Sequence, residues 1–600
     1  MSQLESPPAG DPPSPAPSPT DGERHSRERI APGRSRGAKS GVDLVRRLAA
    51  PLVLAVVPLW WVVDATYRAS LTTIGRDQGI FHYIAWAVRL GDADYRDVRD
   101  VNGPLVHLIH MVMLALGGAD EHRFHVLDHV ATGVSFAIAA ALLPGLVTRA
   151  APRWSERLAW GLAGWVALAG QYALYLYWNQ AQRESFCDWF LLPSICLQVA
   201  RPGRRPARRI LLVAALSTIT WFGKPIFVLF TALQLATLLA DDDLPLSRRE
   251  RLKHFAIGGV IGTLPPLAYL ARFGDVGAFL HITLREVPRV YRFIWARSAP
   301  EILGDEGPLN VATMGLAVSA LLCALVAHRA LPRRVLPLAL APACGVAVAL
   351  AQHKGFGYHF HPLTATTHLG VLVVLILLGE RFRSAPRRRP LGRFVALGAV
   401  TAYALFVASN MRGSPHTKNV WILAGGETPE RRTEREYFDT FKSHDFFPWE
   451  LREGARYLAS VTGEDARVQV YGMDPYLLFL ARRRAATPYI YAYDVNADAA
   501  LDGGWNNRPT FPEAEHIKAV RAAHEHVGLV RLKASPPEAF VFIDRAPLTS
   551  WPDAWEDFRH CCTVTADWVA AHYHAARSFG EVHVWLRDGS PVPDAEGLPP

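Results

Sequence analysis

An acidic residue follows the first long apolar run of the chain at a short distance. Asp77 lies in the stretch GRDQGIFHY at residues 75–83, and the apolar run covers roughly residues 48–66. If that run crosses a bilayer, Asp77 sits at the boundary between membrane and water. A carboxylate at this boundary can accept a proton from a hydroxyl group while a lipid-linked molecule stays in the bilayer. The simpler alternative is that Asp77 caps a helix that starts near Gly79.

A second polar stretch, QHKGFGYHFHP at residues 352–362, combines a lysine with a tyrosine and histidines. The ammonium group of Lys354 and the imidazole of His359 could hold a phosphate at the bilayer surface, with Tyr358 between them. His359 and His361 form a His-x-His pair that could instead bind a divalent metal, although no third ligand is evident. Packing at the membrane interface is the remaining alternative, and the sequence leaves the metal unknown.

Further charged residues lie where apolar runs begin or end. Arg289 and Arg292 stand among aromatic residues in the stretch 285–297, and guanidinium groups pair bidentately with phosphate. Alternatively, they are snorkelling cations in an aromatic belt. Lys224, at the turn between two apolar runs, is a further phosphate candidate. Glu184 opens a later apolar run, either as a substrate contact or as a first-turn acid favoured by the helix dipole.

The elements that must position these residues are membrane helices. Half of the residues are hydrophobic and only 20% are charged, and the charge concentrates between long apolar runs. This pattern is typical of a polytopic α-helical membrane protein and excludes an ordinary soluble enzyme. We expect eleven spans, at roughly 48–66, 126–148, 158–178, 185–200, 210–222, 225–240, 254–272, 309–328, 335–352, 363–379 and 394–410.

Arginine-rich loops indicate the orientation of these spans. They lie at 149–157, 201–209, 247–253, 328–334 and 380–393. Counting 210–222 and 225–240 as two short spans puts all these loops on the N-terminal side, which the positive-inside rule assigns to the cytoplasm. The run 104–117 would break this order, so we expect a juxtamembrane helix there. The same distribution accounts for the net charge of +9 without a nucleic-acid-binding face.

The chain divides into three regions. Residues 1–45 are rich in polar and turn-forming residues, which predicts a disordered cytoplasmic tail. Residues 46–410 form the membrane core, with an outward loop at 67–125. Residues 411–600 are polar, and their patterning predicts an extracytoplasmic α/β domain. We expect strands at 467–472, 487–493, 539–544 and 580–587, and helices at 449–460, 513–530 and 564–575.

The outward loop resembles the first loop of the C-type glycosyltransferase (GT-C) superfamily. That superfamily includes protein O-mannosyltransferases and the aminoarabinose transferases of lipid A. The matching residues are Asp77, Gly79, Gly91, Tyr95, Asp97 and Pro104. The departure is Gln78, where many relatives carry Glu; it weakens a metal role and leaves Asp77 as the matching catalytic position. The stretch 352–362 also resembles a segment of bacterial polyprenyl-linked sugar transferases.

The resemblance implies an inverting membrane glycosyltransferase in the cytoplasmic (inner) membrane of a bacterium. A sugar on a polyprenyl phosphate would pass to a hydroxyl of a glycan, lipid or protein acceptor on the outer side, with Asp77 as the catalytic base. No cofactor is implied with certainty, and a divalent metal is left open. The residues expected to contact substrate are Asp97, Glu184, Lys224, Arg289, Arg292, Lys354, Tyr358, His359 and His361.

Two other functional classes fit the composition. A transporter or flippase of a lipid-linked anion would show internal repeats and ionisable groups deep within its spans. The sequence shows no evident repeat, and its charges cluster at the ends of the spans. A non-catalytic envelope assembly protein would use the C-terminal domain to recruit partners. Neither alternative needs the carboxylate of Asp77.

Overall fold

The computed structural model describes residues 69–146, 154–173, 177–201, 205–384, 434–503, 508–547 and 549–589, together with Tyr175 and a few positions between 60 and 67. The tail predicted at 1–45 and the last span predicted at 394–410 lie outside the described residues. Most of the first predicted span, 48–66, also lies outside them.

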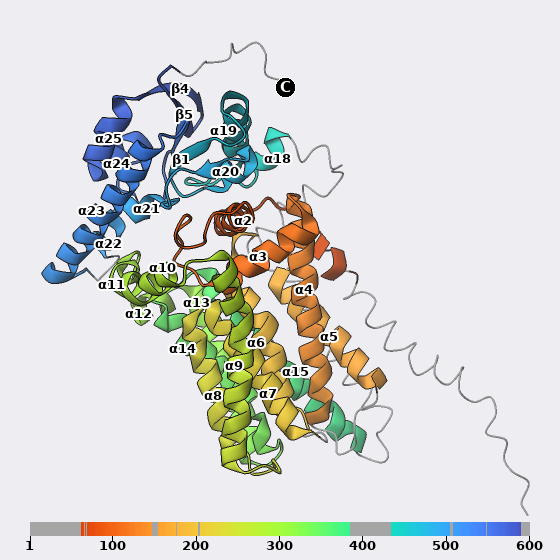
Figure 1. The fold of residues 1–600 in the computed structure, drawn as a ribbon. Coiled ribbons are helices and arrows are strands. Elements are labelled where there is room, and N and C mark those ends of the chain that lie inside the picture. The colour runs from red at the N-terminus through yellow and green to blue at the C-terminus, as the bar shows by residue number, and fades with distance from the viewer. Residues whose placement is uncertain are drawn as a thin grey trace, which may run out of the picture. The chain divides into compact units, whose positions relative to one another are not determined.

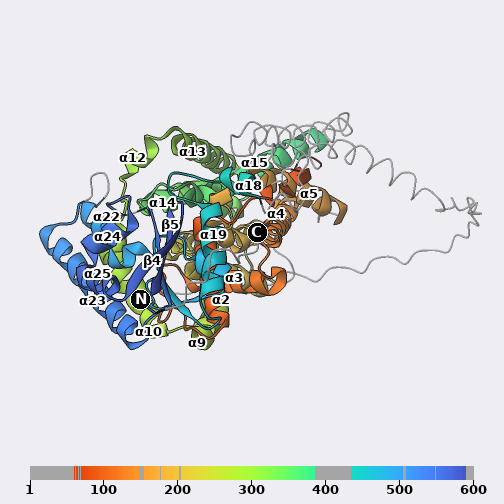
Figure 2. The same cartoon turned by 90° about the horizontal axis from the view of Figure 1, so that it is seen from above.

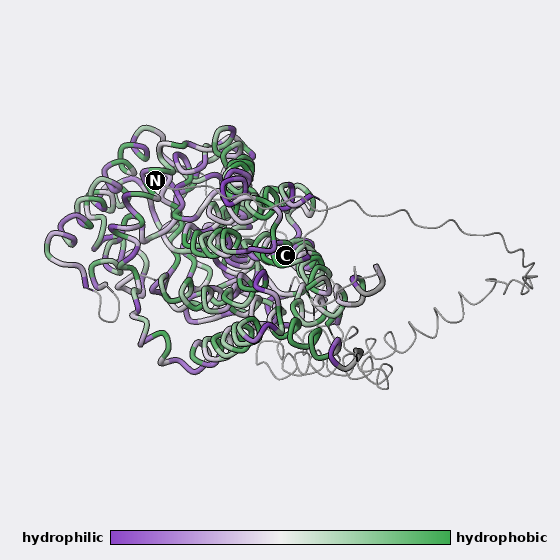
Figure 3. The backbone as a smooth tube through the Cα atoms, turned by 90° about the horizontal axis from the view of Figure 1, so that it is seen from below, coloured by the Kyte–Doolittle hydropathy of each residue, from purple (hydrophilic) through white to green (hydrophobic). Residues whose placement is uncertain are grey.

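Between residues 121 and 384, helices follow the predicted apolar runs (Figure 1). They are α4 (Glu121–Leu142), α5 (Trp154–Ala173), α6 (Arg183–Val199), α7 (Pro206–Ile219), α8 (Val228–Leu239), α9 (Arg248–Phe273), α13 (Glu306–Ala327), α14 (Leu336–Ala351) and α15 (His361–Ser384). Figure 3 shows hydrophobic stretches, drawn in green, along many of the helices. In the described part of the chain, 5 helical segments are long and apolar enough to cross a membrane: Glu121–Leu142, Arg248–Phe273, Glu306–Ala327, Arg333–Ala351 and Gly357–Leu378.

The sequence predicts eleven spans, but only 5 helical segments of the described residues meet this criterion of length and hydropathy. α6, α7 and α8 are shorter than the roughly 20 residues that a perpendicular span needs. The chain is broken at Gly223–Lys224, between the 3-10 turns η3 (Thr220–Phe222) and η4 (Pro225–Phe227). The residues around Lys224 thus form two short helices rather than one long one.

The predicted outward loop contains α2 (Arg76–Arg89) and α3 (Pro104–Gly117). Pro104 is the first residue of α3, a position where the missing N–H of proline removes no helical hydrogen bond. The bounds of α3 are those of the juxtamembrane helix predicted at 104–117. A Cβ at its N-cap, Gly103, would lie 2.0 Å from the carbonyl oxygen of Phe222, so glycine lets the loop pack on the turn before Lys224.

A second group of short elements follows α9 and precedes α15. They are α10 (Val276–His281), the π-helical turn η5 (Ile282–Glu286), α11 (Val287–Arg289), η6 (Tyr291–Phe293), α12 (Ala299–Leu303) and η8 (Gly357–Phe360). None of these was resolved as a separate element by the apolar pattern, because each is shorter than the window over which periodicity can be judged.

The C-terminal region contains a 5-stranded sheet in the order β2-β1-β3-β5-β4. β1 (Arg467–Tyr471) pairs in parallel with β2 (Arg484–Ala485) and β3 (Ala539–Ile543), whereas β5 (Val582–Arg587) is antiparallel to β3 and β4 (Tyr573–Phe579). Helices cover both faces (Figures 1 and 2). One face carries α19 (Pro448–Val461) and α20 (Tyr476–Ala481), and the other carries α23 (Phe511–Ala534), α24 (Ala554–Cys561) and α25 (Thr563–Ala570).

Strand β3 connects two hydrophobic cores. Ala539, Val541 and Ile543 pack in the core that includes α19, α20, α2 and α3, whereas Phe540 and Phe542 pack in the core that includes α24. Successive side chains of a strand point to opposite faces, so one fully buried strand serves both cores. The first of these cores attaches helix α2, which carries Asp77, to the sheet.

Two of the predicted C-terminal elements are wrong. Residues 487–493 are not a strand, and the edge strand is Arg484–Ala485 instead. The tyrosines of 487–493 favour a strand by propensity, but Pro488 cannot donate to a ladder, and Tyr491 is turned into a cavity wall. The helix predicted at 564–575 ends at Ala570, because the following residues pair with β5 as strand β4.

Two glycines let α7 and α9 approach each other closely. A Cβ at Gly258 would lie 2.3 Å from a backbone oxygen of α7, and one at Gly262 would lie 2.2 Å from another. At Gly259 the nearest atom is the Cγ2 of Thr218 at 3.4 Å, an ordinary contact. Small residues four positions apart allow this kind of close crossing between membrane helices.

We expect Gly262→Val to lower the free energy of unfolding by about 1–3 kcal/mol or more, because the added methyl groups must push the two helices apart. Gly259→Val is the matched control, since it makes the same change in the same helix where space exists. Thermal unfolding of the purified proteins in detergent measures both effects. Equal unfolding temperatures for the two variants would contradict the close crossing.

Candidate functional site

A cavity of about 1210 Å³ is lined by residues of the segments 76–102, 178–183, 291–295 and 354–358 and of the C-terminal region. Its wall combines aromatic rings with charged groups of both signs. The charged and aromatic residues on the wall include Arg76, Asp77, Phe81, Trp178, Arg183, Tyr291, Lys354, Tyr358, Asp445, Tyr491, Tyr493 and Arg545. A concave site with many apolar surfaces and a few convergent polar groups is typical of small-molecule recognition.

Asp77 contributes a half-buried carboxylate to this cavity. It is the second residue of α2, and the N-cap of that helix is Gly75, so the alternative that Asp77 is the cap is wrong. Among the described residues, nothing donates a hydrogen bond to this carboxylate or forms an ion pair with it. Burial raises the pKa of Asp77, and the nearby cations Arg183 and Arg76 oppose that rise. A carboxylate with a raised pKa is a stronger proton acceptor.

The amide of Gln78, which follows Asp77, is used fully by backbone groups. Its Oε1 accepts the N–H of Gly75 at 2.8 Å, and its Nε2 donates to the carbonyl oxygens of Tyr177 and Gln180, both at 2.6 Å. An ionised glutamate could not donate to two carbonyl groups. Gln78 therefore fixes the start of α2 against the turn that precedes α6, and Asp77 keeps its place in the cavity wall.

Arg183 is the first residue of α6 and lines the same cavity. Its Nη1 donates to Oδ1 of Asn102, and its guanidinium lies over the ring of Tyr358, 5.0 Å from the centroid. Its Nε is buried and has no hydrogen-bond partner among the described residues. A guanidinium and the free carboxylate of Asp77 therefore face one shared space from two different helices.

Lys354 lines the cavity and also fixes one of its walls. It is only 8% exposed, and its Nζ donates to the carbonyl oxygens of Tyr291 at 3.1 Å, of Arg292 at 3.4 Å and of Ile294. Burial, with a smaller contribution from the charge on Lys224, lowers the pKa of Lys354 to about 7. Four residues of the 352–362 stretch line the cavity: Lys354, Phe356, Gly357 and Tyr358.

Three predicted residues meet in a buried cluster beside Arg183. Oε1 of Glu184 accepts a hydrogen bond from Nζ of Lys224 at 2.6 Å, and Nε2 of His359 lies 3.7 Å from the same Oε1. Burial and the charge on Arg183 lower the pKa of Lys224 to about 8. Since none of the three lines the cavity, their position favours support of Arg183 over direct contact with a substrate.

The other predicted residues of the basic loop and the motif lie away from the cavity. His361 donates through Nε2 to the carbonyl oxygen of Asn179 at 2.7 Å. Arg292 is exposed and pairs with Glu513 of the C-terminal region. The two residues are so far apart in the sequence that no local pattern could predict this ion pair. Arg289 is exposed and has no ion pair in the described part of the chain.

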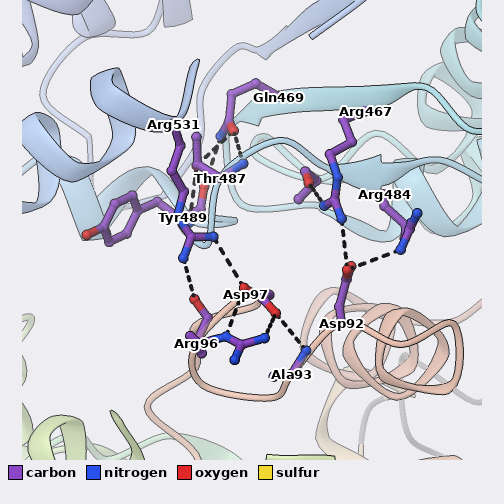
Figure 4. Close-up of polar contacts among 11 residues, drawn as sticks. Asp92, Ala93, Arg96, Asp97, Arg467, Gln469, Arg484, Thr487, Tyr489 and Arg531 are labelled. Carbon is purple, nitrogen blue, oxygen red and sulfur yellow. Dashed lines mark hydrogen bonds and ion pairs between the residues drawn. The ribbon is translucent and has the colours of Figure 1, made fainter. Parts of the chain in front are cut away.

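Asp97 belongs to the contact between the outward loop and the C-terminal region (Figure 4). Its carboxylate accepts from Arg96 at 2.7 Å and from Arg531 at 3.4 Å. Asp92 of the same loop pairs with two further arginines, Arg467 at 3.0 Å and Arg484 at 3.3 Å. This position favours an organising role for Asp97, because the residue does not line the cavity.

A buried charge network shapes the outward loop. His107 is fully buried, and its Nδ1 lies 2.7 Å from Asp94 while its Nε2 lies 2.8 Å from Asp100. Asp100 also accepts from Asn102 at 2.8 Å and from Tyr491 at 2.9 Å. Burial alone would lower the pKa of His107, but the two carboxylates raise it to about 10. The imidazolium therefore fixes Asn102, the residue that receives Arg183.

Two arginines join the outward loop to the C-terminal region. Arg76 pairs with Asp474 and Asp445, each at 3.1 Å. Arg99 is buried between Asp494 and Glu286. The sequence alone predicts no role for either arginine, because arginines are frequent throughout the chain. The signal that could have marked Arg76 is its position directly before Asp77.

The structure adds Arg183, Asn102 and Tyr291 to the candidate site. Arg183 directly precedes Glu184, and Asn102 lies two residues before Pro104, but the 81 positions between Arg183 and Asn102 give no indication that they touch. Among the described residues, no group of three or more His, Cys, Asp or Glu side chains could hold a metal ion. Nε2 of His361 contacts the carbonyl oxygen of Asn179, whereas Nε2 of His359 lies near Glu184 and Lys224.

Charge on His107 should stabilise the loop at neutral and acidic pH. Its pKa is raised from the ordinary value to about 10 on folding, so the contribution is complete below roughly pH 6.5 and fades as the pH rises through 10. In an Asp94→Asn/Asp100→Asn variant the imidazole stays neutral. The difference in unfolding temperature between wild type and variant should be larger at pH 6 than at pH 10. A difference that does not change with pH would contradict the buried imidazolium.

No protein-family model matches the chain, and no curated protein matches it either. Among solved structures, the chain is similar to the oligosaccharyltransferase of Archaeoglobus fulgidus. Its crystal structure in the apo form matches with a TM-score of 0.43 and 10% identity, over 84% of this chain and 70% of that one. The complex with Zn and sulfate matches with a TM-score of 0.35 and 13% identity, over 80% and 67%. Similarity of this degree establishes neither a shared fold nor a shared activity.

Proposed function

We propose that the chain is an inverting membrane glycosyltransferase that uses a sugar carried on a polyprenyl phosphate. The acceptor is a hydroxyl group of a glycan, lipid or protein on the outer side of a bacterial cytoplasmic membrane. The observation that carries this proposal is the unpaired carboxylate of Asp77, which shares a large cavity with the guanidinium of Arg183. The reaction class, sugar transfer, comes from the resemblance of the motif around Asp77 to glycosyltransferases. The cavity supports it because it offers space for a substrate beside Asp77.

The proposed reaction is a single displacement. Asp77 takes the proton of the acceptor hydroxyl, and the oxygen forms a new bond to the anomeric carbon from the face opposite the leaving group. The bond from that carbon to the phosphate oxygen breaks, and the lipid phosphate leaves with the electron pair. Arg183 stabilises the charge that develops on the departing phosphate, because a preorganised guanidinium is most effective where water is excluded. Configuration at the anomeric carbon is inverted.

The surroundings of Asp77 suit this role. A proton acceptor must be unpaired before substrate binds, and the hydrogen-bond donors nearest in sequence are occupied: Arg76 by Asp445 and Asp474, and Gln78 by backbone groups. Burial raises the pKa of Asp77, which makes its carboxylate a stronger proton acceptor. Rings such as Tyr291 and Tyr358 add apolar wall against which a sugar ring can pack.

Asp77→Asn should reduce sugar transfer by about 10²–10⁴-fold, because it keeps the size of the side chain and removes the proton acceptor. Transfer is measured by mass spectrometry of envelope glycans from cells that lack the native gene and express each variant at matched levels. Asp502→Asn is the matched control, since Asp502 also lines the cavity but is exposed. Near-normal transfer by Asp77→Asn, or an equal loss in the control, would refute Asp77 as the base.

Removing the proposed phosphate contact should affect donor use. Arg183→Gln should weaken transfer at limiting donor by a factor that corresponds to about 1.5–3 kcal/mol, the usual value of a charge-assisted hydrogen bond. Arg292→Gln is the matched control, because Arg292 pairs with Glu513 outside the cavity. The measurement is initial rate against donor concentration, using polyprenyl-linked sugars extracted from the same cells. Equal donor dependence for both variants would count against Arg183.

A further inference from the structure

Residues 276–289 form a continuous helical segment from α10 through η5 to α11. It starts at Val276, with two residues between it and the end of α9 at Phe273, and α9 is long and apolar enough to cross a membrane. The carboxylate of Asp275 accepts the N–H of Ala278 at 2.9 Å, so the segment starts with a capped turn. Three residue steps span at most about 11 Å, which keeps the start of this segment close to the end of α9.

The exposed surface of this segment has two parallel stripes. Val276, Leu280 and Leu284, spaced four residues apart, are 46%, 46% and 66% exposed. On a helix, residues four apart share one face. Such a stripe of bare aliphatic side chains on a short outer helix is unfavourable in water.

Basic side chains form the second stripe at the same spacing. It consists of His281, Arg285 and Arg289, each displaced by one residue from a member of the apolar stripe, and His281 contacts Glu286 at 3.1 Å. Arg285 and Arg289 are exposed and have no ion pair in the described part of the chain. A helix with an apolar face bordered by unpaired arginines is typical of segments that lie in a membrane interface.

The opposite face of the segment is anchored, so the stripes cannot turn inward. Ile282 and Glu286 are buried, and Glu286 pairs with the buried guanidinium of Arg99. The ring of Phe279 packs against Tyr95, with 5.0 Å between centroids. Ile282 and Glu286 are the first and last residues of the π-helical turn, and both are buried.

We propose that residues 276–289 lie flat on the membrane surface at the end of α9 and bind the anionic headgroups of phospholipids. Leu280 and Leu284 enter the acyl boundary, and Arg285 and Arg289 bind lipid phosphates from above it. The charge of the arginines and the continuity with α9 select an anionic bilayer surface as the occupant. The proposal is independent of the glycosyltransferase assignment, and Arg292, which is held by Glu513, takes no part in it.

The first test measures lipid preference with the full-length protein. Purified, delipidated protein in detergent is titrated with phosphatidylglycerol or phosphatidylcholine, and bound lipids are counted by native mass spectrometry. Each juxtamembrane arginine contributes about a fivefold preference for an anionic surface. Arg285→Gln/Arg289→Gln should therefore lose most of the preference for phosphatidylglycerol, whereas the control Arg559→Gln/Arg577→Gln, on the C-terminal region, should keep it. An unchanged preference in the first variant would overturn the proposal.

The second test measures depth and does not depend on charge. Leu284→Trp and the control Val564→Trp, an exposed position on α25, are placed in nanodiscs whose phosphatidylglycerol is brominated in its acyl chains. The additional fluorescence of Leu284→Trp over wild type should be quenched, and that of Val564→Trp should not. An unquenched signal from Leu284→Trp would mean that the stripe faces water or a protein partner, and it would overturn the proposal.

Discussion

The candidate site depends on one buried charge, the imidazolium of His107 between the carboxylates of Asp94 and Asp100. Ionised carboxylates in a protein interior are costly unless a cation compensates them, and here a single residue compensates both. Asp100 in turn holds Asn102, to which Arg183 donates. The conformation of the loop, and with it the direction of the guanidinium in the cavity, therefore follows from this compensated pair.

Most of the charged groups that surround the base of the cavity are held by partners within the protein. Arg76 and Arg99 each bind two carboxylates, Lys354 is held by three carbonyl oxygens, and Lys224 binds Glu184. The carboxylate of Asp77 lacks such a partner among the described residues. A group that the surrounding structure holds in place but leaves unsatisfied is available to a substrate. This contrast supports the catalytic role proposed for Asp77 more strongly than its position in a motif does.

The C-terminal region and the segment that follows α9 complete the cavity from two sides. Tyr491, Tyr493 and Arg545 bring the C-terminal region into the wall, while Tyr291 and Ile294 extend directly from the end of the segment 276–289. Lys354 holds the carbonyl groups of that same stretch. A segment that rests on lipid headgroups would thus lead into the wall of the site, which is the geometry that a lipid-linked substrate requires.

Local signals in the sequence determined the elements that are long or strongly patterned. Apolar runs predicted the helices between residues 121 and 384, Pro104 predicted the start of α3, and alternation predicted β1, β3 and β5. The motif also selected Asp77, Lys354 and Tyr358, which do line the cavity. Only the tertiary structure decided that Arg183 joins Asp77, whereas Asp97 and Arg292 pair with Arg531 and Glu513. Periodicity reports how neighbouring residues share a face, but an ion pair between residues hundreds of positions apart is set by how whole elements pack, and spacing along the chain carries no trace of it.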